Sequence, residues 1–240
     1  MEKVEEKERI DRITGKPRRV PTLCVNGVSY VVRDGEEDKE IVSNARFHVF
    51  RGESVSITGA SGSGKTTLLS LAGLLLQPTE GNIIVSNIMA SSLPDNKRSI
   101  VRMDHMGFVF QQPQLIGSLT ALEQLTYPQA MSGLKPDHHR AMELLDAVGI
   151  ADQAHKKPHQ LSGGQQQRVT IARAVMGNPD VILADEPTAS LDSVSGEKVM
   201  RLLLKMSKDT SLVLVTHDQR AASMCDRGYT MTNGILTPAH

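Results

Sequence analysis

Hydrophobic residues fall into two kinds of segment along this 240-residue chain. Short runs of apolar and β-branched residues predict strands, and the clearest runs lie at residues 23–32, 41–50, 55–57, 82–85, 106–110, 181–185 and 211–215. A charged segment at residues 33–39 predicts a turn. Near the C-terminus, Asn233-Gly234 between two apolar runs predicts a closing hairpin. Helical segments separate several of these strands, so the pattern indicates an α/β fold.

Helices are predicted where apolar residues recur every three or four positions. After residue 64 this spacing is carried by Leu68, Leu69, Leu71 and Leu74. Asp95 or Asn96 is expected to cap a second helix, and Asp192 or Ser193 a later one that ends near residue 207. Residues 114–160 also have helical spacing, but prolines at 128, 136 and 158 interrupt it, which predicts a small helical insertion.

The segment at residues 59–67 reads G-x-x-x-x-G-K-T-T between a predicted strand and a predicted helix, the context that a P-loop requires. Its glycines let successive backbone N–H groups point at phosphate oxygens, and the helix N-terminus adds further donors. Lys65 can reach the β- and γ-phosphates, and the Thr66 hydroxyl suits Mg²⁺. The predicted phosphate site consists of Gly59, Ala60, Ser61, Gly62, Ser63, Gly64, Lys65, Thr66 and Thr67.

Polar residues follow three of the predicted strands, at the edge where an α/β sheet binds its ligands. Asp185 can hold Mg²⁺ through water, and Glu186 can polarise an attacking water. Gln111 can complete a Mg²⁺ shell, and His217 can hydrogen-bond a γ-phosphate. Taken alone, Gln111 and His217 fit a structural role better than a catalytic one.

A second anion site is predicted where Ser162, Gly163, Gly164 and Gln165 open another helix. Exposed backbone donors, a hydroxyl and the helix dipole converge there. The chain thus has two phosphate-binding helix starts but one lysine-bearing loop. A dimer that shares each nucleotide between two chains would use both.

Composition narrows the function classes. The formal net charge is +0 and aromatic residues make up 3% of the chain, which argues against a nucleic-acid surface. Cys24 and Cys225 form no CxxC, so we expect neither a disulfide framework nor a zinc site. The histidine pairs at 138–139 and 155/159 are expected to be structural rather than metal or haem ligands. We expect no secretory signal and no membrane span, since the most apolar stretch, residues 68–76, is about half a span long.

In their order along the chain, the P-loop, Gln111, the Leu-Ser-Gly-Gly-Gln segment ending at Gln165, Asp185-Glu186, Ser-Leu-Asp192 and His217 resemble the ATP-binding subunit of an ABC transporter over residues 22–237. The resemblance implies a P-loop NTPase fold with a RecA-like mixed sheet flanked by helices. It also implies an antiparallel β subdomain and a helical subdomain at about residues 112–165. The charged composition of residues 1–21, outside the resemblance, predicts a flexible tail. ATP and Mg²⁺ are the implied cofactors.

The resemblance also implies roles for individual residues. Thr66, Gln111 and Asp185 would serve Mg²⁺, Glu186 would be the general base and His217 would sense the γ-phosphate. In a head-to-tail dimer, the nucleotide of the opposing copy would be contacted by Ser162, Gly163, Gly164, Gln165 and Asp192. The family stacks adenine on an aromatic residue at a position that falls near Val32, and Tyr30 is the nearest aromatic here.

Finer features, among them Gly-Phe-Val-Phe-Gln111 and Ala-Asp-Glu-Pro-Thr188, resemble the branch that serves MacB-, LolD- and FtsE-type membrane partners. Within this branch the segments are most similar to HrtA-type haem exporters. This implies a subunit on the cytoplasmic face of the membrane that powers a separate permease, in an exporter of haem. An FtsE-like regulatory ATPase without cargo is the alternative. A GTPase is disfavoured because no Asn-Lys-x-Asp follows the P-loop.

The N-terminal segment has a second interpretation. It is charged and contains Lys16, Arg18 and Arg19, which form a small basic cluster. A solvated tail is expected, and contact of this cluster with a membrane surface is the alternative.

Overall fold

The computed structural model describes residues 20–35 and 37–239. The basic cluster and most of the predicted tail at residues 1–21 therefore lie outside the described residues. The strands are β1 (Leu23–Asp34), β2 (Glu37–Val49), β3 (Ser54–Thr58), β4 (Glu80–Val85), β5 (Ile88–Met89), β6 (Met106–Val109), β7 (Val181–Asp185), β8 (Ser211–Val215), β9 (Arg227–Thr232) and β10 (Ile235–Pro238). The helices are α1 (Lys65–Ala72), α2 (Asp95–His105), α3 (Ala121–Met131), α4 (His138–Ala147), α5 (Gly163–Val175), α6 (Ser193–Met206) and α7 (Gln219–Ala222).

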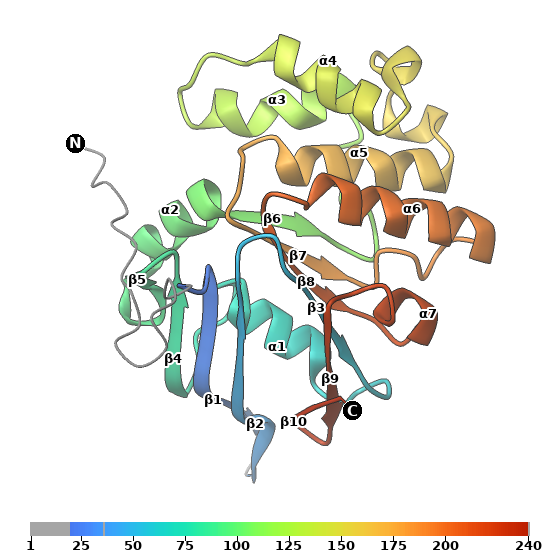
Figure 1. Ribbon diagram of the computed structural model, residues 1–240. Helices are drawn as coiled ribbons and strands as arrows, with labels where there is room; N and C mark the ends of the chain where they lie inside the picture. Colours follow the sequence, from blue (N-terminus) through green and yellow to red (C-terminus); the bar gives the residue numbers. More distant parts are fainter. Residues whose placement is uncertain (1–19, 36, 240) are drawn as a thin grey trace, which may run out of the picture.

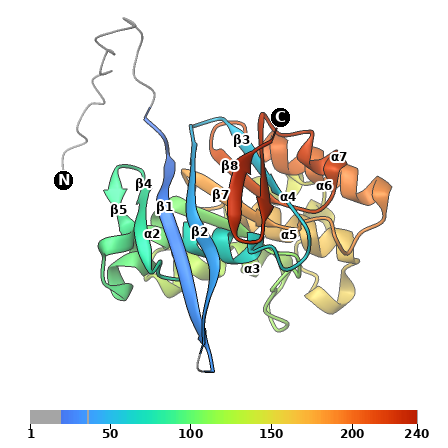
Figure 2. The same cartoon turned by 90° about the horizontal axis from the view of Figure 1, so that it is seen from below.

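The ten strands of the described residues form one mixed sheet in the order β5-β4-β1-β2-β10-β9-β3-β8-β7-β6. One end of it is antiparallel, since β1 pairs antiparallel with β2 and with β4. The other end is parallel, with β3 beside both β8 and β9, and β7 between β8 and β6. Figure 1 shows the two parts curling around α1, and Figure 2 shows the long β1–β2 ribbon extending from the sheet.

The parallel strands are buried on both faces, which explains their continuous apolar sequences. Along β7, Val181 and Leu183 belong to the core around α1, whereas Ile182 and Ala184 belong to a second core on the opposite face. The residues of β8 alternate in the same way. Because successive side chains of a strand point to opposite faces of the sheet, each of these five-residue strands contributes to both cores.

The second core extends away from the sheet through three helices. Helix α5 packs on β6 and beside α6, and α3 and α4 lie over the outer side of α5 (Figure 1). Leu125 of α3 and Leu145 of α4 are fully buried in this core together with Ile171 of α5. The predicted boundary near residue 165 falls in the first turn of α5.

The predicted turn at residues 33–39 is wrong in extent. Antiparallel pairing continues from Val32 opposite Lys39 to Asp34 opposite Glu37, so only two residues separate β1 from β2. Charged side chains are accepted in a ribbon whose end projects from the sheet, although they lower strand propensity. Composition therefore suggested a loop where backbone pairing extends the hairpin.

Two expectations about helices also fail. Neither Asp95 nor Asn96 caps α2: Pro94 occupies the N-cap position without a side-chain cap, and Asp95 lies in the first turn. Pro128 does not break α3, which continues to Met131. Pro128 lies in the last turn, and Ser132 closes the helix by donating to its carbonyl from both the amide and the hydroxyl. Because Pro128 lies so close to the end of α3, few helical residues follow whose geometry it could disturb.

Candidate nucleotide site

The P-loop connects the end of β3 to the start of α1, as its sequence predicts. Gly64 is the N-cap of α1 with φ of 102°, a conformation that favours glycine. Lys65 begins the helix, is 7% exposed, and donates from Nζ to the carbonyls of Gly59 at 2.9 Å and Ala60 at 2.7 Å. The lysine ammonium is therefore held inside the loop, at the place where phosphate oxygens would replace the two carbonyls.

The loop is also pressed against the sheet. A Cβ on Gly59 would lie 2.2 Å from the carbonyl oxygen of Met231 in β9, and one on Gly64 would lie 2.6 Å from the carbonyl oxygen of Ile41 in β2. Neither position has room for a side chain. The backbone of this loop is therefore fixed by strands from both parts of the sheet.

Asp185 ends β7 beside α1, and its Oδ1 accepts a hydrogen bond from the Thr66 hydroxyl at 3.3 Å. Burial is the largest cause of a raised pKa at Asp185, with a smaller contribution from the Glu186 charge. The Thr66 hydrogen bond and the Lys65 charge act in the opposite direction. A divalent cation next to this carboxylate would favour its charged form.

Glu186 has φ of 45°, an uncommon value for a residue with a side chain. Its amide donates to the Val215 carbonyl at 2.9 Å, which fixes this turn against the end of β8. Its Oε1 accepts from the His217 amide at 2.9 Å and lies 2.8 Å from His217 Nδ1, while its Oε2 accepts from the Thr216 hydroxyl at 3.1 Å. The carboxylate is thus oriented by two consecutive residues beyond β8.

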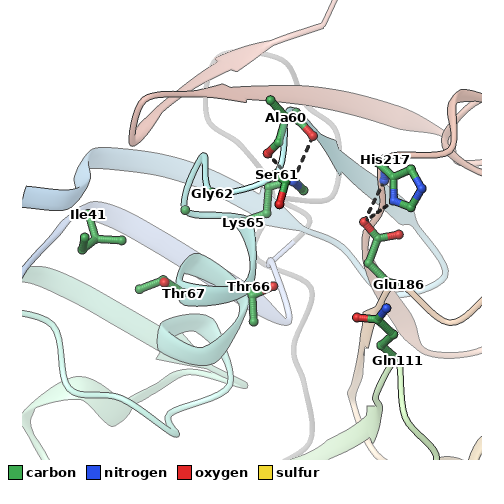
Figure 3. Close-up of a pocket in the computed structure, with 12 residues that line it drawn as sticks. Ile41, Ala60, Ser61, Gly62, Lys65, Thr66, Thr67, Gln111, Glu186 and His217 are labelled. Carbon is green, nitrogen blue, oxygen red and sulfur yellow. Dashed lines mark hydrogen bonds and ion pairs between the residues drawn. The ribbon is translucent and has the colours of Figure 1, made fainter. Parts of the chain in front are cut away.

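These groups surround one cavity of about 630 Å³. Figure 3 shows Gln111, Glu186 and His217 on one side and the P-loop with Lys65 and Thr66 on the other. Ile41 also lines the cavity. The structure therefore brings together the predicted phosphate loop, Gln111, Glu186 and His217, with Asp185 bonded to the Thr66 hydroxyl at its edge.

The residues of this cavity fit a nucleotide phosphate with Mg²⁺. Lys65 lines the cavity together with Ser61, Thr66 and Thr67, so an ammonium and three hydroxyls are available to phosphate oxygens. Hydroxyl, carboxylate and amide oxygens are available from Thr66, Asp185 and Gln111, and these hard donors match Mg²⁺.

The predicted second anion site lies elsewhere. Ser162 is the N-cap of α5, and its hydroxyl and the Gln165 side chain form a capping box. A Cβ on Gly163 or Gly164 would meet only a Leu191 side-chain atom, at 3.9 and 4.0 Å. Asp192 caps α6 through the amides of Val194 and Ser195. None of Ser162, Gly163, Gly164, Gln165 and Asp192 lines the P-loop cavity.

The position predicted for adenine contact also differs from the observed lining. Tyr30 is half-buried and packs against the core around α1, whereas the cavity is lined by Ile41 from the neighbouring strand β2. No sequence signal identified Ile41, because its place at the cavity depends on how β2 packs against Gly64 of the P-loop. Thr216 was also missed, although it directly precedes His217.

Replacing Gly59 by alanine is expected to lower the free energy of unfolding by about 2–4 kcal/mol, because the new Cβ would collide with β9. Gly62→Ala is the matched control: Gly62 also has positive φ, 76°, but nothing lies within 4 Å of its added Cβ. Backbone strain alone predicts a loss of about 1 kcal/mol there. Urea unfolding measures both values, and equal losses would contradict the close approach of the loop to Met231.

Comparisons with known proteins agree with this geometry. Residues 42–189, more than half of the chain, match the family described as ABC transporter. The chain is 44% identical over 214 residues to the ABC transporter ATP-binding protein MJ0796 of Methanocaldococcus jannaschii, covering 85% of this chain and 91% of that protein. It is 40% identical over 220 residues to the lipoprotein-releasing system ATP-binding protein LolD of Gluconobacter oxydans, covering 90% and 95%.

Longer relatives match over part of their length. The chain is 42% identical over 205 residues to the macrolide export ATP-binding/permease protein MacB of Bartonella henselae, covering 84% of this chain but 31% of that protein. It spans about a third of the length of the MacB relatives that it matches.

A solved structure supports the fold. The dimeric post-hydrolysis MJ0796 cassette bound to ADP and Pi has a TM-score of 0.82 at 40% identity, covering 91% of this chain and 99% of that one. The predicted ABC-type P-loop fold is therefore confirmed. Together with the site, these matches establish that the chain belongs to the ABC transporter family as an ATP-binding subunit of the MacB and LolD type, an ATPase whose cofactors are ATP and Mg²⁺.

Proposed function

We propose that this chain hydrolyses ATP to power a membrane permease carried on a separate polypeptide, as part of an exporter. The observation that carries the proposal is the cavity in which Lys65, Gln111, Glu186 and His217 meet. Among the helices of residues 20–35 and 37–239, none is long and apolar enough to cross a membrane. We place the chain on the cytoplasmic face of the membrane, held there by the permease.

In this proposal, Lys65 and the P-loop amides bind the phosphates, and Thr66, Gln111 and Asp185 serve Mg²⁺. The metal supplies charge neutralisation at the phosphate oxygens. Glu186 takes a proton from the attacking water, and His217 hydrogen-bonds the γ-phosphate. Most of the rate enhancement comes from positioning and electrostatic stabilisation.

A second copy would complete each site. The start of α5 at Ser162 offers backbone donors on the protein surface, away from the P-loop of the same chain. A head-to-tail dimer would place Ser162–Gln165 and Asp192 of one copy against the nucleotide held by the other. ATP would close this dimer, and hydrolysis would open it.

A groove between α2, α3 and α5 is suited to receive a short helix from the permease. It has a volume of about 780 Å³, and its lining combines polar and charged residues with apolar ones, among them Met103, Phe108, Phe110, Leu134 and Met176. Met103 and Leu134 are 53% and 62% exposed, and Met131 at the end of α3 is 69% exposed. Apolar side chains gathered beside a groove are typical of a partner site.

This groove and the nucleotide cavity share a segment. Phe110 lines the groove and the next residue, Gln111, lines the cavity. Helix α5 holds the segment, since the Gln167 side chain donates to the Phe110 carbonyl and Arg173 donates to the Pro113 and Gln114 carbonyls. We propose that the predicted helical subdomain at about residues 112–165 transmits motion through this segment.

Met103→Glu is expected to abolish co-purification with the permease and to leave the basal ATPase rate within about twofold, since a charge in an apolar interface core is costly. Ile235→Glu is the matched control, because Ile235 on β10 is 55% exposed and lies outside the groove. Affinity purification from membranes in mild detergent measures both. Equal retention of the permease by the two variants would exclude this groove.

Haem is the cargo to test first, on the strength of the sequence resemblance alone. The decisive experiment purifies the tagged chain from native membranes, identifies the co-purifying membrane protein, and measures ATPase activity with and without haem. Haem stimulation that is lost in Glu186→Gln would support haem export. A stable membrane partner without a haem response would reject that cargo, and absence of any membrane partner would favour the FtsE-like regulatory alternative.

A further inference from the structure

Thr216 lies at a junction of three parts of the nucleotide site. It directly follows β8, its side chain is fully buried, and its amide donates to the carbonyl of Ile57 in β3, the strand that leads into the P-loop. Its hydroxyl contacts both Glu186 and the amide of Asp218, the N-cap of α7. A buried threonine in a strand end often satisfies its own backbone, but this hydroxyl reaches the carboxylate of another strand.

The hydrogen-bond pattern fixes the direction of the hydroxyl proton. A hydroxyl has one proton and accepts through its lone pairs. The Asp218 amide can only donate, at 3.0 Å, so the hydroxyl oxygen accepts from it. The proton is then free to point at Oε2 of Glu186, 3.1 Å away. An ionised carboxylate only accepts, so Thr216 is the donor in this contact.

The two carboxylate oxygens of Glu186 are held differently. Oε1 has two partners, the amide and the ring Nδ1 of His217. For Oε2, the described structure gives Thr216 as its hydrogen-bond partner. Without the hydroxyl, Oε2 would lose this partner, and the carboxylate would be held through Oε1 by His217, free to turn about that contact. The orientation of the Glu186 carboxylate, which lines the cavity, therefore depends on Thr216 as well as on His217.

We propose that Thr216 is a positioning residue that orients the Glu186 carboxylate for proton abstraction from water. The proposal rests on the assignment of Glu186 as general base. Thr216 itself does not line the nucleotide cavity, so it acts on the reaction through Glu186. Because its amide is bonded to β3 and its hydroxyl to the start of α7, it also keeps the base in register with the P-loop.

Thr216→Val removes the hydroxyl and keeps the shape of the side chain. We expect kcat to fall about 10- to 100-fold, since misplacing a catalytic group by about 1 Å can lower the rate by about 100-fold. KM for ATP and the stoichiometry of Mg-ATP binding are expected to stay within about twofold, because no phosphate contact is removed. Thr216→Ser, which restores the hydroxyl, is expected to recover most of the rate.

Thr210→Val is the matched control. Thr210 precedes β8 at its opposite end, is also buried, and donates from its hydroxyl to the Pro179 carbonyl at 2.7 Å. This variant also loses a hydrogen bond from a buried threonine hydroxyl, here to a backbone carbonyl, and Thr210 does not line the cavity. An equal fall of kcat in both variants would show a general loss of structure and overturn the proposal. Rates are measured per bound nucleotide in single turnover, so unfolded protein in a preparation does not lower the measured rate. Thr216→Ala provides a second variant that lacks the hydroxyl.

A double-mutant comparison tests whether Thr216 acts through the carboxylate. In a Glu186→Ala background, Thr216→Val is expected to cause no further loss of the residual single-turnover rate. A further loss there, or a Thr216→Val rate equal to that of the unmodified chain, would overturn the proposal. Normal turnover in Glu186→Gln would instead reject Glu186 as the base, so the two failures are distinguishable.

Discussion

Glu186→Gln is expected to slow ATP hydrolysis by about 10²–10⁴-fold, the range typical of removing a general base. The amide keeps the shape of the side chain but cannot take the proton of the attacking water. The hydrogen bonds of the Glu186 carboxylate go to Thr216 and His217 rather than to the P-loop, so ATP binding should be retained. ATP and Mg²⁺ should then hold the protein as a stable dimer, which multi-angle light scattering with size-exclusion chromatography would detect.

The matched control for this variant is Glu143→Gln. Glu143 is half-exposed on α4, where it pairs with His139 and Arg140 on the surface. It carries the same change of charge outside the nucleotide cavity, so turnover should be unaffected and no trapped dimer should form. If Glu186→Gln turned over ATP at the normal rate, the assignment of the base would be wrong.

Lys65→Ala is expected to weaken Mg-ATP binding by about 100-fold or more, the equivalent of losing about 3 kcal/mol of charge-assisted hydrogen bonds. The ammonium is buried and already oriented by the carbonyls of Gly59 and Ala60. Little conformational entropy is therefore lost when it transfers to phosphate oxygens. Alanine removes the charge and also leaves those two carbonyls facing the ligand.

Titration calorimetry with Mg-ATP measures this loss, and Lys205→Ala on the exposed side of α6 is its control. Both variants lose one positive charge, so the difference between them isolates the contribution of the site from that of net charge. An unchanged dissociation constant in Lys65→Ala would argue against phosphate binding by this loop.

Local sequence predicted the elements that carry the site because each of them is encoded over a short range. The P-loop needs only a strand, a glycine-rich loop and a helix start in succession, and the structure has all three around Lys65. Asp185 and His217 were placed correctly at strand ends because parallel strands in such a sheet end at the same edge. Predictions of this kind do not depend on how distant segments pair.

The features that sequence missed depend on long-range pairing. Ile41 reaches the cavity because β2 passes close to Gly64 of the P-loop, a contact between segments that are separate in the sequence. The role that we propose for Thr216 depends on its contact with Glu186, a residue 30 positions away in sequence that follows a different strand. No periodicity or turn signal encodes either distance.

The alternation along β7 has a consequence for how this chain can diverge. Adjacent residues of the strand face opposite cores, so inserting or deleting one residue would exchange the two sets of packed side chains. The same shift would turn Asp185 away from Thr66. Substitution is therefore the change that the parallel strands can accept, while changes of length are better tolerated in exposed connections.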